Sequence, residues 1–125
     1  MKKAIYTDQA PAALGPYSQA ILTGDTLFLS GQVGIDPDEG KIMAETVDGQ
    51  TRQVMRNLEA VLQAANMSFA NVVKTTIYLS SMEDFQAVNG IYGEYFKTDP
   101  PARVTIQVAA LPLGALVEIE AVARR

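Results

Sequence analysis

Residues 46–80 read TVDGQTRQVMRNLEAVLQAANMSFANVVKTTIYLS, and this stretch passes from a helical pattern to a strand pattern. From 46 to 66 the apolar side chains recur at helical spacing, which predicts an amphipathic helix with a buried face made of Val54, Met55, Leu58, Val61, Leu62 and Ala65. Residues 72–80 are rich in β-branched side chains and predict a strand. A helix followed by such a strand indicates a sheet that is covered by helices.

The segments before residue 46 predict a β-hairpin and a tight turn. Strands are expected at 17–23 and 26–30, and the residues between them, Gly24 and Asp25, are typical of a hairpin turn. The run DPDEG at 36–40 combines Pro, Asp and Gly, and it predicts a second turn.

After residue 80 the chain predicts a second helix and two further strands. Ser81 followed by Asp84 resembles a capping box, and Pro100 and Pro101 are expected to end the helix that it opens. The apolar stripe of this helix consists of Phe85, Val88, Tyr92, Tyr95 and Phe96. Strands are expected at 103–109 and 116–124, joined by a turn at 111–114. One sheet with both helices on one face accommodates this order, which predicts a single α+β domain over residues 1–125.

The last two predicted strands alternate between apolar and polar side chains. In the strand at 116–124, one face carries the apolar residues Val117, Ile119, Ala121 and Ala123, and the opposite face carries Glu118 and Glu120. In the strand at 103–109, one face carries the apolar residues Val104, Ile106 and Val108, and the opposite face carries Arg103, Thr105 and Gln107. We expect both apolar faces to pack on the helices. The polar faces are then either solvated, as is common for antiparallel sheets, or covered by further copies of the chain with polar clefts between subunits.

Composition excludes several classes of protein. The 125 residues carry 14 acidic and 10 basic side chains, a net charge of −4 that argues against nucleic-acid binding driven by bulk electrostatics. The chain has no Cys and no His, which excludes disulfides, thiolate nucleophiles, Cys–metal sites and His-dependent catalysis. We find no metal-ligand cluster, no apolar run long enough to span a membrane and no signal peptide, so we expect a cytoplasmic protein.

Arg103 and two glutamates are the first candidates for chemistry. Arg103 follows the stiff segment DPPA, and its planar fork suits a carboxylate or a phosphate. The alternative is a salt bridge from Arg103 to Glu118 or Glu120 on the neighbouring strand. The two glutamates share one strand face, where they could divide acid and base work or form a hydrated, arginine-paired surface.

Four further residues have both a binding and a structural interpretation. Tyr17 could form the wall of a pocket or be a half-buried strand aromatic, and Asn89 could be a buried hydrogen-bonding group or face solvent. Ser30 and Gly31 end a strand, where they could approach a ligand or form a bulge.

Several stretches together resemble the Rid (YjgF) family over nearly the whole chain. The front half carries QAPAA at 9–13, GPYSQ at 15–19 and LSGQ at 29–32. The back half carries VKTT at 73–76, the pair Val88–Asn89, PAR at 101–103 and VEIEA at 117–121. Each motif is short, but all of them occur in the order expected for the family.

The resemblance implies a chorismate-mutase-like α+β fold, with one mixed sheet and two helices on one face, that assembles as a homotrimer with sites at the subunit interfaces. It also implies hydrolytic deamination of reactive 2-imino acids, namely 2-iminobutanoate and 2-iminopropanoate, to 2-keto acids and ammonia. The implied partner is the small substrate, and no cofactor, metal, membrane or nucleic acid is expected.

The family's functional residues fall on matching positions of this sequence. By resemblance, Arg103 binds the substrate carboxylate and Glu118 positions the attacking water, while Tyr17, Ser30, Gly31 and Asn89 line the pocket. Thr105, which is also assigned to substrate binding, stands where many relatives have a cysteine, so a thiol takes no part here. We expect Arg103 and Glu118 to face Tyr17, Ser30 and Asn89 across the cleft.

Two other functions are compatible with the same residues. Some relatives are described as ribonucleases or translation inhibitors, an activity that the acidic charge disfavours here. A non-enzymatic module that binds small carboxylates would also use Arg103, but it would not need a glutamate to position water.

Overall fold

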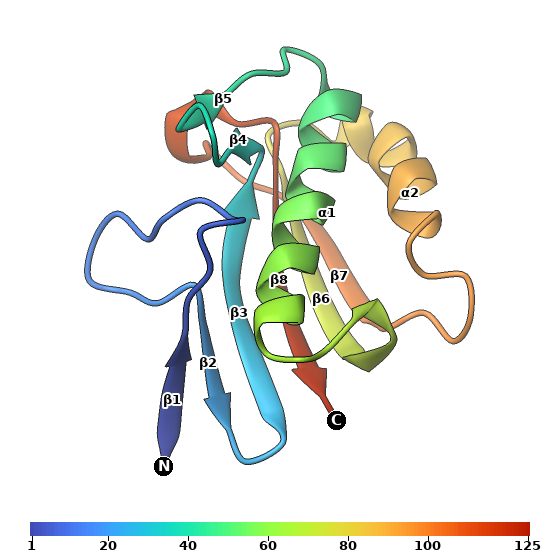
Figure 1. Cartoon of the computed structure of the whole chain (residues 1–125). Helices are drawn as coiled ribbons and strands as arrows, with labels where there is room; N and C mark the ends of the chain where they lie inside the picture. The colour runs from blue at the N-terminus through green and yellow to red at the C-terminus, as the bar shows by residue number, and fades with distance from the viewer.

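The structure, a computed structural model that describes residues 1–125, contains eight strands and two α-helices. The strands are β1 (Lys2–Ile5), β2 (Ala20–Thr23), β3 (Thr26–Val33), β4 (Ile35–Asp36), β5 (Lys41–Ile42), β6 (Val72–Leu79), β7 (Ala102–Gln107) and β8 (Val117–Arg124). The helices are α1 (Val47–Ala64) and α2 (Phe85–Gly93). Six strands form one sheet in the order β1-β2-β3-β8-β6-β7, while β4 and β5 form a separate hairpin (Figure 1).

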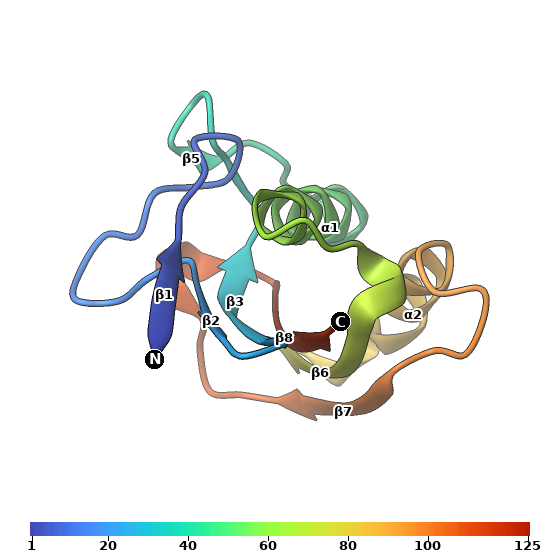
Figure 2. The ribbon, with the colours of Figure 1, turned by 60° about the horizontal axis from the view of Figure 1, so that its bottom comes forward.

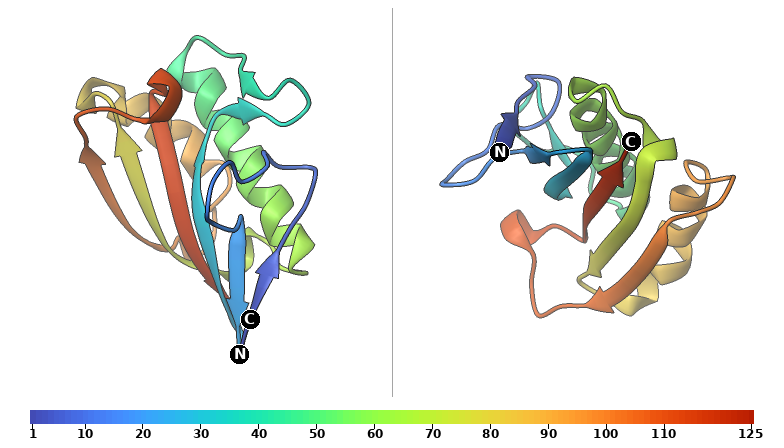
Figure 3. Two further views of the ribbon diagram at one scale, coloured as in Figure 1. Left: turned by 90° about the vertical axis from the view of Figure 1, so that its left-hand side faces the viewer. Right: turned by 90° about the horizontal axis from the view of Figure 1, so that it is seen from below.

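The sheet is mixed, and both helices lie on the same face of it (Figure 2). The β6–β7 pair is parallel, and every other pair in the main sheet is antiparallel. Figure 3 shows the sheet edge-on: the helices cover one of its faces, and the opposite face is open. The predicted α+β architecture with two helices on one face is therefore confirmed. Neither helix combines the length and the apolar character that crossing a bilayer requires.

Helix α1 forms where the apolar periodicity predicts it. The Thr46 side chain caps its start by accepting a hydrogen bond from the Gly49 N–H at 3.1 Å. Its apolar face is fully buried against β3 and β8 and, with the strand residues, makes one continuous core. The buried residues of this face include Val54, Met55, Leu58, Val61, Leu62 and Ala65, as predicted.

The N-terminal segment differs from the prediction of a strand at 17–23. Strand β2 begins only at Ala20, so that Tyr17 lies in the loop before it. The buried Gln19 side chain holds this loop, because its Nε2 donates to the carbonyl oxygens of Thr7 and Pro11 at 3.0 and 2.8 Å. The short strand β1, which the sequence pattern did not predict, adds an edge to the sheet beside β2.

Helix α2 is shorter than its apolar stripe suggested. Ser81 accepts from the N–H of Glu83 and caps a 3₁₀ turn at Met82–Asp84, after which α2 runs only to Gly93. Tyr95 and Phe96 therefore lie beyond the helix, and the chain leaves it several residues before Pro100. Phe96 is still buried, because its ring packs on Tyr92 with centroids 4.7 Å apart.

The expectation that both apolar strand faces pack on the helices is correct for β8 and wrong for β7. In β8 the residues Val117, Ile119 and Ala123 are fully buried on the helix side. The parallel register pairs Arg103 with Thr75, which is also buried on that side. Paired residues share a face, so Arg103 and Thr105 face the helices, while Val104 and Ile106 lie on the open face, 45% and 42% exposed.

Candidate functional site

The predicted site residues form two separate clusters on opposite faces of the sheet. The first, which we call the arginine cleft, is a hollow of about 450 Å³ lined by Asn89, Tyr92, Gly93, Phe96, Pro100, Pro101 and Arg103. The second, the glutamate cleft, is a hollow of about 670 Å³ whose lining includes Tyr17, Ser30, Gly31, Glu118 and Glu120.

In the arginine cleft the guanidinium of Arg103 is held without any carboxylate. Its Nη1 donates to Oδ1 of Asn89 at 2.7 Å, and its Cζ lies 5.7 Å from the ring centroid of Phe85 and 5.1 Å from that of Tyr92. The salt bridges of the chain lie elsewhere, at Arg52–Glu94 and Arg125–Asp25. The remaining donors of Arg103 are therefore available to an anion, and the planar fork suits a carboxylate.

Helix α2 supplies the partners of Arg103 from a single face. Phe85, Asn89 and Tyr92 are spaced at i, i+4 and i+7, so their side chains project from the same side toward the β7 edge of the sheet. Thr105 lies two residues along β7 on the same face as Arg103, and its Oγ1 is buried with no hydrogen-bond partner. Such an orphaned hydroxyl is unusual in a folded protein.

In the glutamate cleft the carboxylate of Glu118 stands directly against the backbone of Gly31. A Cβ placed on Gly31 would collide with this carboxylate, whose Cδ would lie only 3.0 Å from it. A side chain at this position would therefore displace the Glu118 carboxylate from its present place. Burial, and to a smaller extent the neighbouring Glu120, raises the pKa of Glu118 above its ordinary value.

A bulge in β3 presents Ser30 and Gly31 to the same cleft. The register between β3 and β8 shifts between Leu29 and Gln32, which takes Ser30 and Gly31 out of the regular ladder. The Ser30 hydroxyl donates to the Ser18 carbonyl oxygen at 2.6 Å, so its oxygen remains free to accept a hydrogen bond.

The second glutamate of the pair is engaged differently from the first. The hydroxyl of Tyr78, on the adjacent strand β6, donates to Oε2 of Glu120 at 3.0 Å. This hydrogen bond is the main reason why the pKa of Tyr78 is raised. Because Glu118 has no such partner, its carboxylate is left free to accept hydrogen bonds in the cleft.

Comparison with known proteins decides the family. The family model described as endoribonuclease L-PSP matches residues 7–125. The chain belongs to this family, the Rid (YjgF) family.

Named relatives and solved structures agree with this assignment. The human protein named 2-iminobutanoate/2-iminopropanoate deaminase is 48% identical over 123 residues, which cover 98% of this chain and 90% of the human one. A Rid-family structure from Yersinia pestis matches with a TM-score of 0.98 and 48% identity, covering all of both chains. The structure of E. coli TdcF with bound serine matches with a TM-score of 0.94 and 37% identity, covering 98% of each chain.

The arrangement of the site in this Rid chain corrects two expectations. Arg103 makes no ion pair with Glu118 or Glu120, because the register places it on the other face of the sheet. Arg103 and Glu118 also do not stand together opposite Tyr17, Ser30 and Asn89. The structure groups Arg103 with Asn89, and it groups Glu118 with Tyr17, Ser30 and Gly31.

Several cleft residues of the Rid chain were not singled out from the sequence. Phe85 and Tyr92 were assigned to the core stripe of the second helix, although their spacing with Asn89 would have placed all three on one face. Leu14 and Leu113 line the glutamate cleft from loops and are strongly exposed. No periodic pattern points to loop residues, so no sequence signal identified these two.

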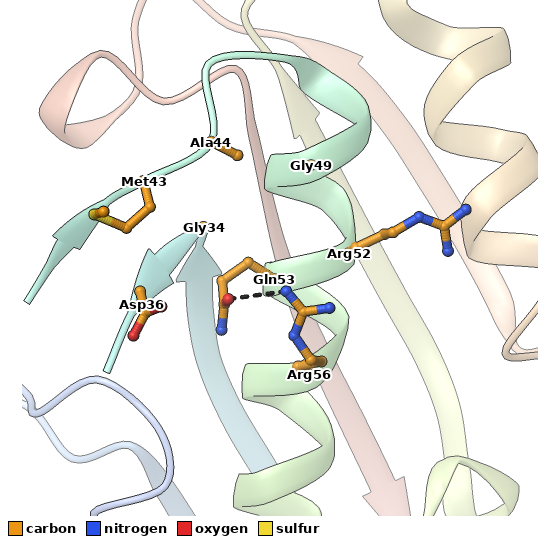
Figure 4. Close-up of a pocket in the computed structure, with 8 residues that line it drawn as sticks. All are labelled: Gly34, Asp36, Met43, Ala44, Gly49, Arg52, Gln53 and Arg56. Carbon is orange, nitrogen blue, oxygen red and sulfur yellow. Dashed lines mark hydrogen bonds between the residues drawn. The ribbon is translucent and has the colours of Figure 1, made fainter. Parts of the chain in front are cut away.

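A third hollow, between the β4–β5 hairpin and α1, contains none of the predicted site residues (Figure 4). Its arginines are already engaged: Arg52 is bonded to Glu94 of the segment after α2, and Arg56 donates to Oε1 of Gln53 at 3.0 Å. In the whole chain, no group of three or more Asp or Glu side chains comes close enough together to hold a metal ion.

Proposed function

We propose that this protein hydrolyses small 2-imino acids, 2-iminobutanoate and 2-iminopropanoate, to 2-keto acids and ammonia. The observation that carries the proposal is the Arg103 guanidinium, which is fixed in a cleft yet has no carboxylate partner of its own. The human relative named for this activity supports the same conclusion. A site for a 2-imino acid must grip the carboxylate first, because the carboxylate is the only fixed charge that all these substrates share.

We propose further that the chain assembles as a cyclic trimer with a chorismate-mutase-like fold. Val104 and Ile106 are apolar yet exposed on the open face of the sheet, together with Phe28. An apolar sheet face of this kind is typical of a surface that another subunit covers. In a head-to-tail ring, the arginine cleft of one subunit meets the glutamate cleft of the next, which completes the site at each interface.

In the proposed reaction the arginine cleft and the glutamate cleft have separate tasks. Arg103 binds the carboxylate of the protonated imine, and Glu118 holds one water against the imine carbon. Water attacks this carbon: the new C–O bond forms, the C=N π electrons move to nitrogen, and Glu118 accepts the proton from water. Glu118 then returns the proton to nitrogen, and the C–N bond breaks as the C=O bond forms. The hydroxyl proton passes through Glu118 to the departing ammonia, so that the keto acid and ammonium leave. The raised pKa of Glu118 suits a group that both accepts and returns a proton.

The remaining cleft residues are assigned supporting tasks in this proposal. The Ser30 oxygen accepts a hydrogen bond from the iminium N–H, because the Ser30 hydroxyl hydrogen is already given to Ser18. Gly31 leaves room for Glu118. Tyr17 closes the cleft wall and Asn89 orients Arg103, while Thr105, whose hydroxyl is buried, flanks Arg103 on the same face of β7.

The test follows 2-keto acid formation from freshly released 2-iminobutanoate, generated by a threonine dehydratase, with and without this protein. We expect the wild type to accelerate the reaction, and Arg103→Ala and Glu118→Gln not to do so. Binding of 2-oxobutanoate without any acceleration would overturn the proposal in favour of a carboxylate-binding module.

RNA cleavage is a second candidate because the matching family model is described as an endoribonuclease. The net charge of −4 and the single free cation in the two clefts disfavour binding of a polyanion. Incubation of purified protein with RNA, beside Arg103→Ala, tests it directly. We expect no cleavage that depends on Arg103.

A further inference from the structure

Tyr92 has a feature that ordinary core packing does not require. The residue is only 4% exposed, and its hydroxyl forms a 2.6 Å hydrogen bond with the hydroxyl of Thr75, which is itself 2% exposed. A Phe–Val pair in the same place would bury a similar apolar surface without two polar groups to satisfy. A buried polar pair of this kind fixes a geometry more than it adds stability.

The register of the sheet links this hydrogen bond to Arg103. Thr75 of β6 is the direct neighbour of Arg103 in β7, and both side chains point toward α2. Tyr92 reaches from α2 over both strands: its hydroxyl ends on Thr75, and its ring lies 5.1 Å from Cζ of Arg103. The hydrogen bond to Thr75 acts as a tether at the far end of the Tyr92 ring. It therefore determines where the face of the ring lies relative to the guanidinium.

The guanidinium of Arg103 would otherwise be free to move, because Asn89 is the only hydrogen-bond partner of this side chain. An arginine side chain has many rotamers, and ordering it when a ligand binds reduces affinity. The aromatic ring attracts the cation and favours one orientation before the ligand arrives. Phe85 lies farther from the guanidinium, at 5.7 Å, and its ring carries no tether.

We propose that Tyr92, held in place by Thr75, is a positioning residue that orients Arg103 and so sets the affinity of the cleft for carboxylates. The inference rests on the proposed function, because it assumes that Arg103 binds the substrate carboxylate. Tyr92 acts through Arg103 and does not touch the reacting atoms.

The experiment is a double-mutant cycle read out by calorimetric binding of 2-oxobutanoate and by KM and kcat for 2-iminobutanoate. We expect Tyr92→Leu to weaken binding and raise KM about fivefold or more, with a much smaller change in kcat. In an Arg103→Lys background, where the ammonium cannot stack flat on the ring, the same substitution should change the dissociation constant less than twofold. The neutral 2-oxobutanamide should show no dependence on Tyr92.

Two milder variants and a matched control keep the test informative if Tyr92→Leu unfolds the chain. Thr75→Val and Tyr92→Phe each remove the tether while retaining the ring, and each should weaken binding about two- to threefold. Phe69→Leu removes a ring from the other end of the same aromatic cluster, where it contacts Tyr95 and Phe96 and does not line the cleft. It should leave the affinity for 2-oxobutanoate unchanged.

The outcomes separate this inference from the proposed function. Unchanged affinity in all three Tyr92 and Thr75 variants, or an equal loss in the Arg103→Lys background, would overturn the positioning role while hydrolysis by the wild type stands. Binding that depends on Tyr92 without hydrolysis would support the positioning role and overturn the proposed reaction. A wild type that neither binds 2-oxobutanoate nor hydrolyses 2-iminobutanoate would overturn both.

Discussion

Strands β7 and β8 carry the same alternation of apolar and polar residues, yet they present it to opposite sides. In β8 the apolar residues Val117 and Ile119 point to the helices, and Glu118 points to the open face. In β7 the apolar residues Val104 and Ile106 point to the open face, and Arg103 points to α2. The two side chains proposed to carry out the reaction of this Rid protein therefore lie on opposite faces of one sheet.

The difference follows from position in the sheet. Strand β8 is central, between β3 and β6, and its helix side is covered by α1. Strand β7 is the edge strand, beside the short helix α2, where a cleft remains open to solvent and can accommodate a charged side chain. Alternation establishes which residues share a face. Coverage by the rest of the molecule, and by other subunits in the proposed trimer, determines which face is apolar.

The largest expected effect comes from removing Arg103, the charged residue that β7 directs toward α2. We expect Arg103→Ala to lower kcat/KM for 2-iminobutanoate by about a thousandfold, since two charged hydrogen bonds contribute roughly 1.5–3 kcal/mol each. The fold and the assembly should persist, which circular dichroism and mass photometry would check. A variant with full activity would contradict the assignment of the carboxylate site.

Equivalent truncations in the two strands should have different consequences. Ile119→Ala, at a fully buried position of β8, should lower the free energy of unfolding by about 2–5 kcal/mol in denaturant titrations. Ile106→Ala, at a position of β7 that is 42% exposed, should change the free energy of unfolding much less, provided that the protein is dilute enough to be monomeric. Its main effect should be on assembly, measured as a higher dissociation constant of the proposed trimer. Equal losses of stability at such dilution would contradict the assignment of the two faces.

Thr105 allows a smaller test on the helix side of β7. Because its hydroxyl is buried without a partner, Thr105→Val should raise the free energy of unfolding by about 1 kcal/mol. Because the buried hydroxyl does not line the arginine cleft, KM should change little in the same variant. Thermal unfolding and steady-state kinetics would measure the two effects, and a loss of stability would show that the hydroxyl has a partner.

The smallest expected effect is a pH dependence of stability at Glu118. Its folded-state pKa is raised, so its protonated form is favoured by folding, and this contribution is lost as the pH rises through the folded-state pKa. Glu118→Gln should therefore match the wild type in Tm at pH 3 and melt slightly higher at pH 7. Activity should nevertheless be lost. A lower Tm at pH 7 would contradict the burial of an ionised carboxylate at this position.

Much of the fold could be predicted from the sequence, because it depends on local periodicity. Helix α1 and strands β6 and β8 follow from their apolar spacing, and the turn residues correctly indicated where the hairpins lie. Strand β1 could not be predicted, since its short and mostly exposed segment carries no apolar pattern. The length of α2 was overestimated because Tyr95 and Phe96 continue the apolar content after the helix has ended.

The site was predictable as a set of residues but not as an arrangement. Arg103, Glu118 and the pocket residues follow from the family resemblance, and they remain proposals until they are tested. Their division between two faces depends on the parallel register of β7 against β6, which no single strand's sequence encodes. The contact between Tyr92 and Arg103 depends on the same register together with the placement of α2.

The most direct test of the account is complementation between two inactive variants. Arg103→Ala and Glu118→Gln are mixed, unfolded together and refolded, and 2-iminobutanoate hydrolysis is measured beside each parent treated alone. If each site combines the arginine cleft of one subunit with the glutamate cleft of the next, about a quarter of the interfaces carry two intact halves. The account predicts recovery of about a quarter of wild-type activity. Activity no higher than that of the parents, in trimers shown to be mixed, would contradict it.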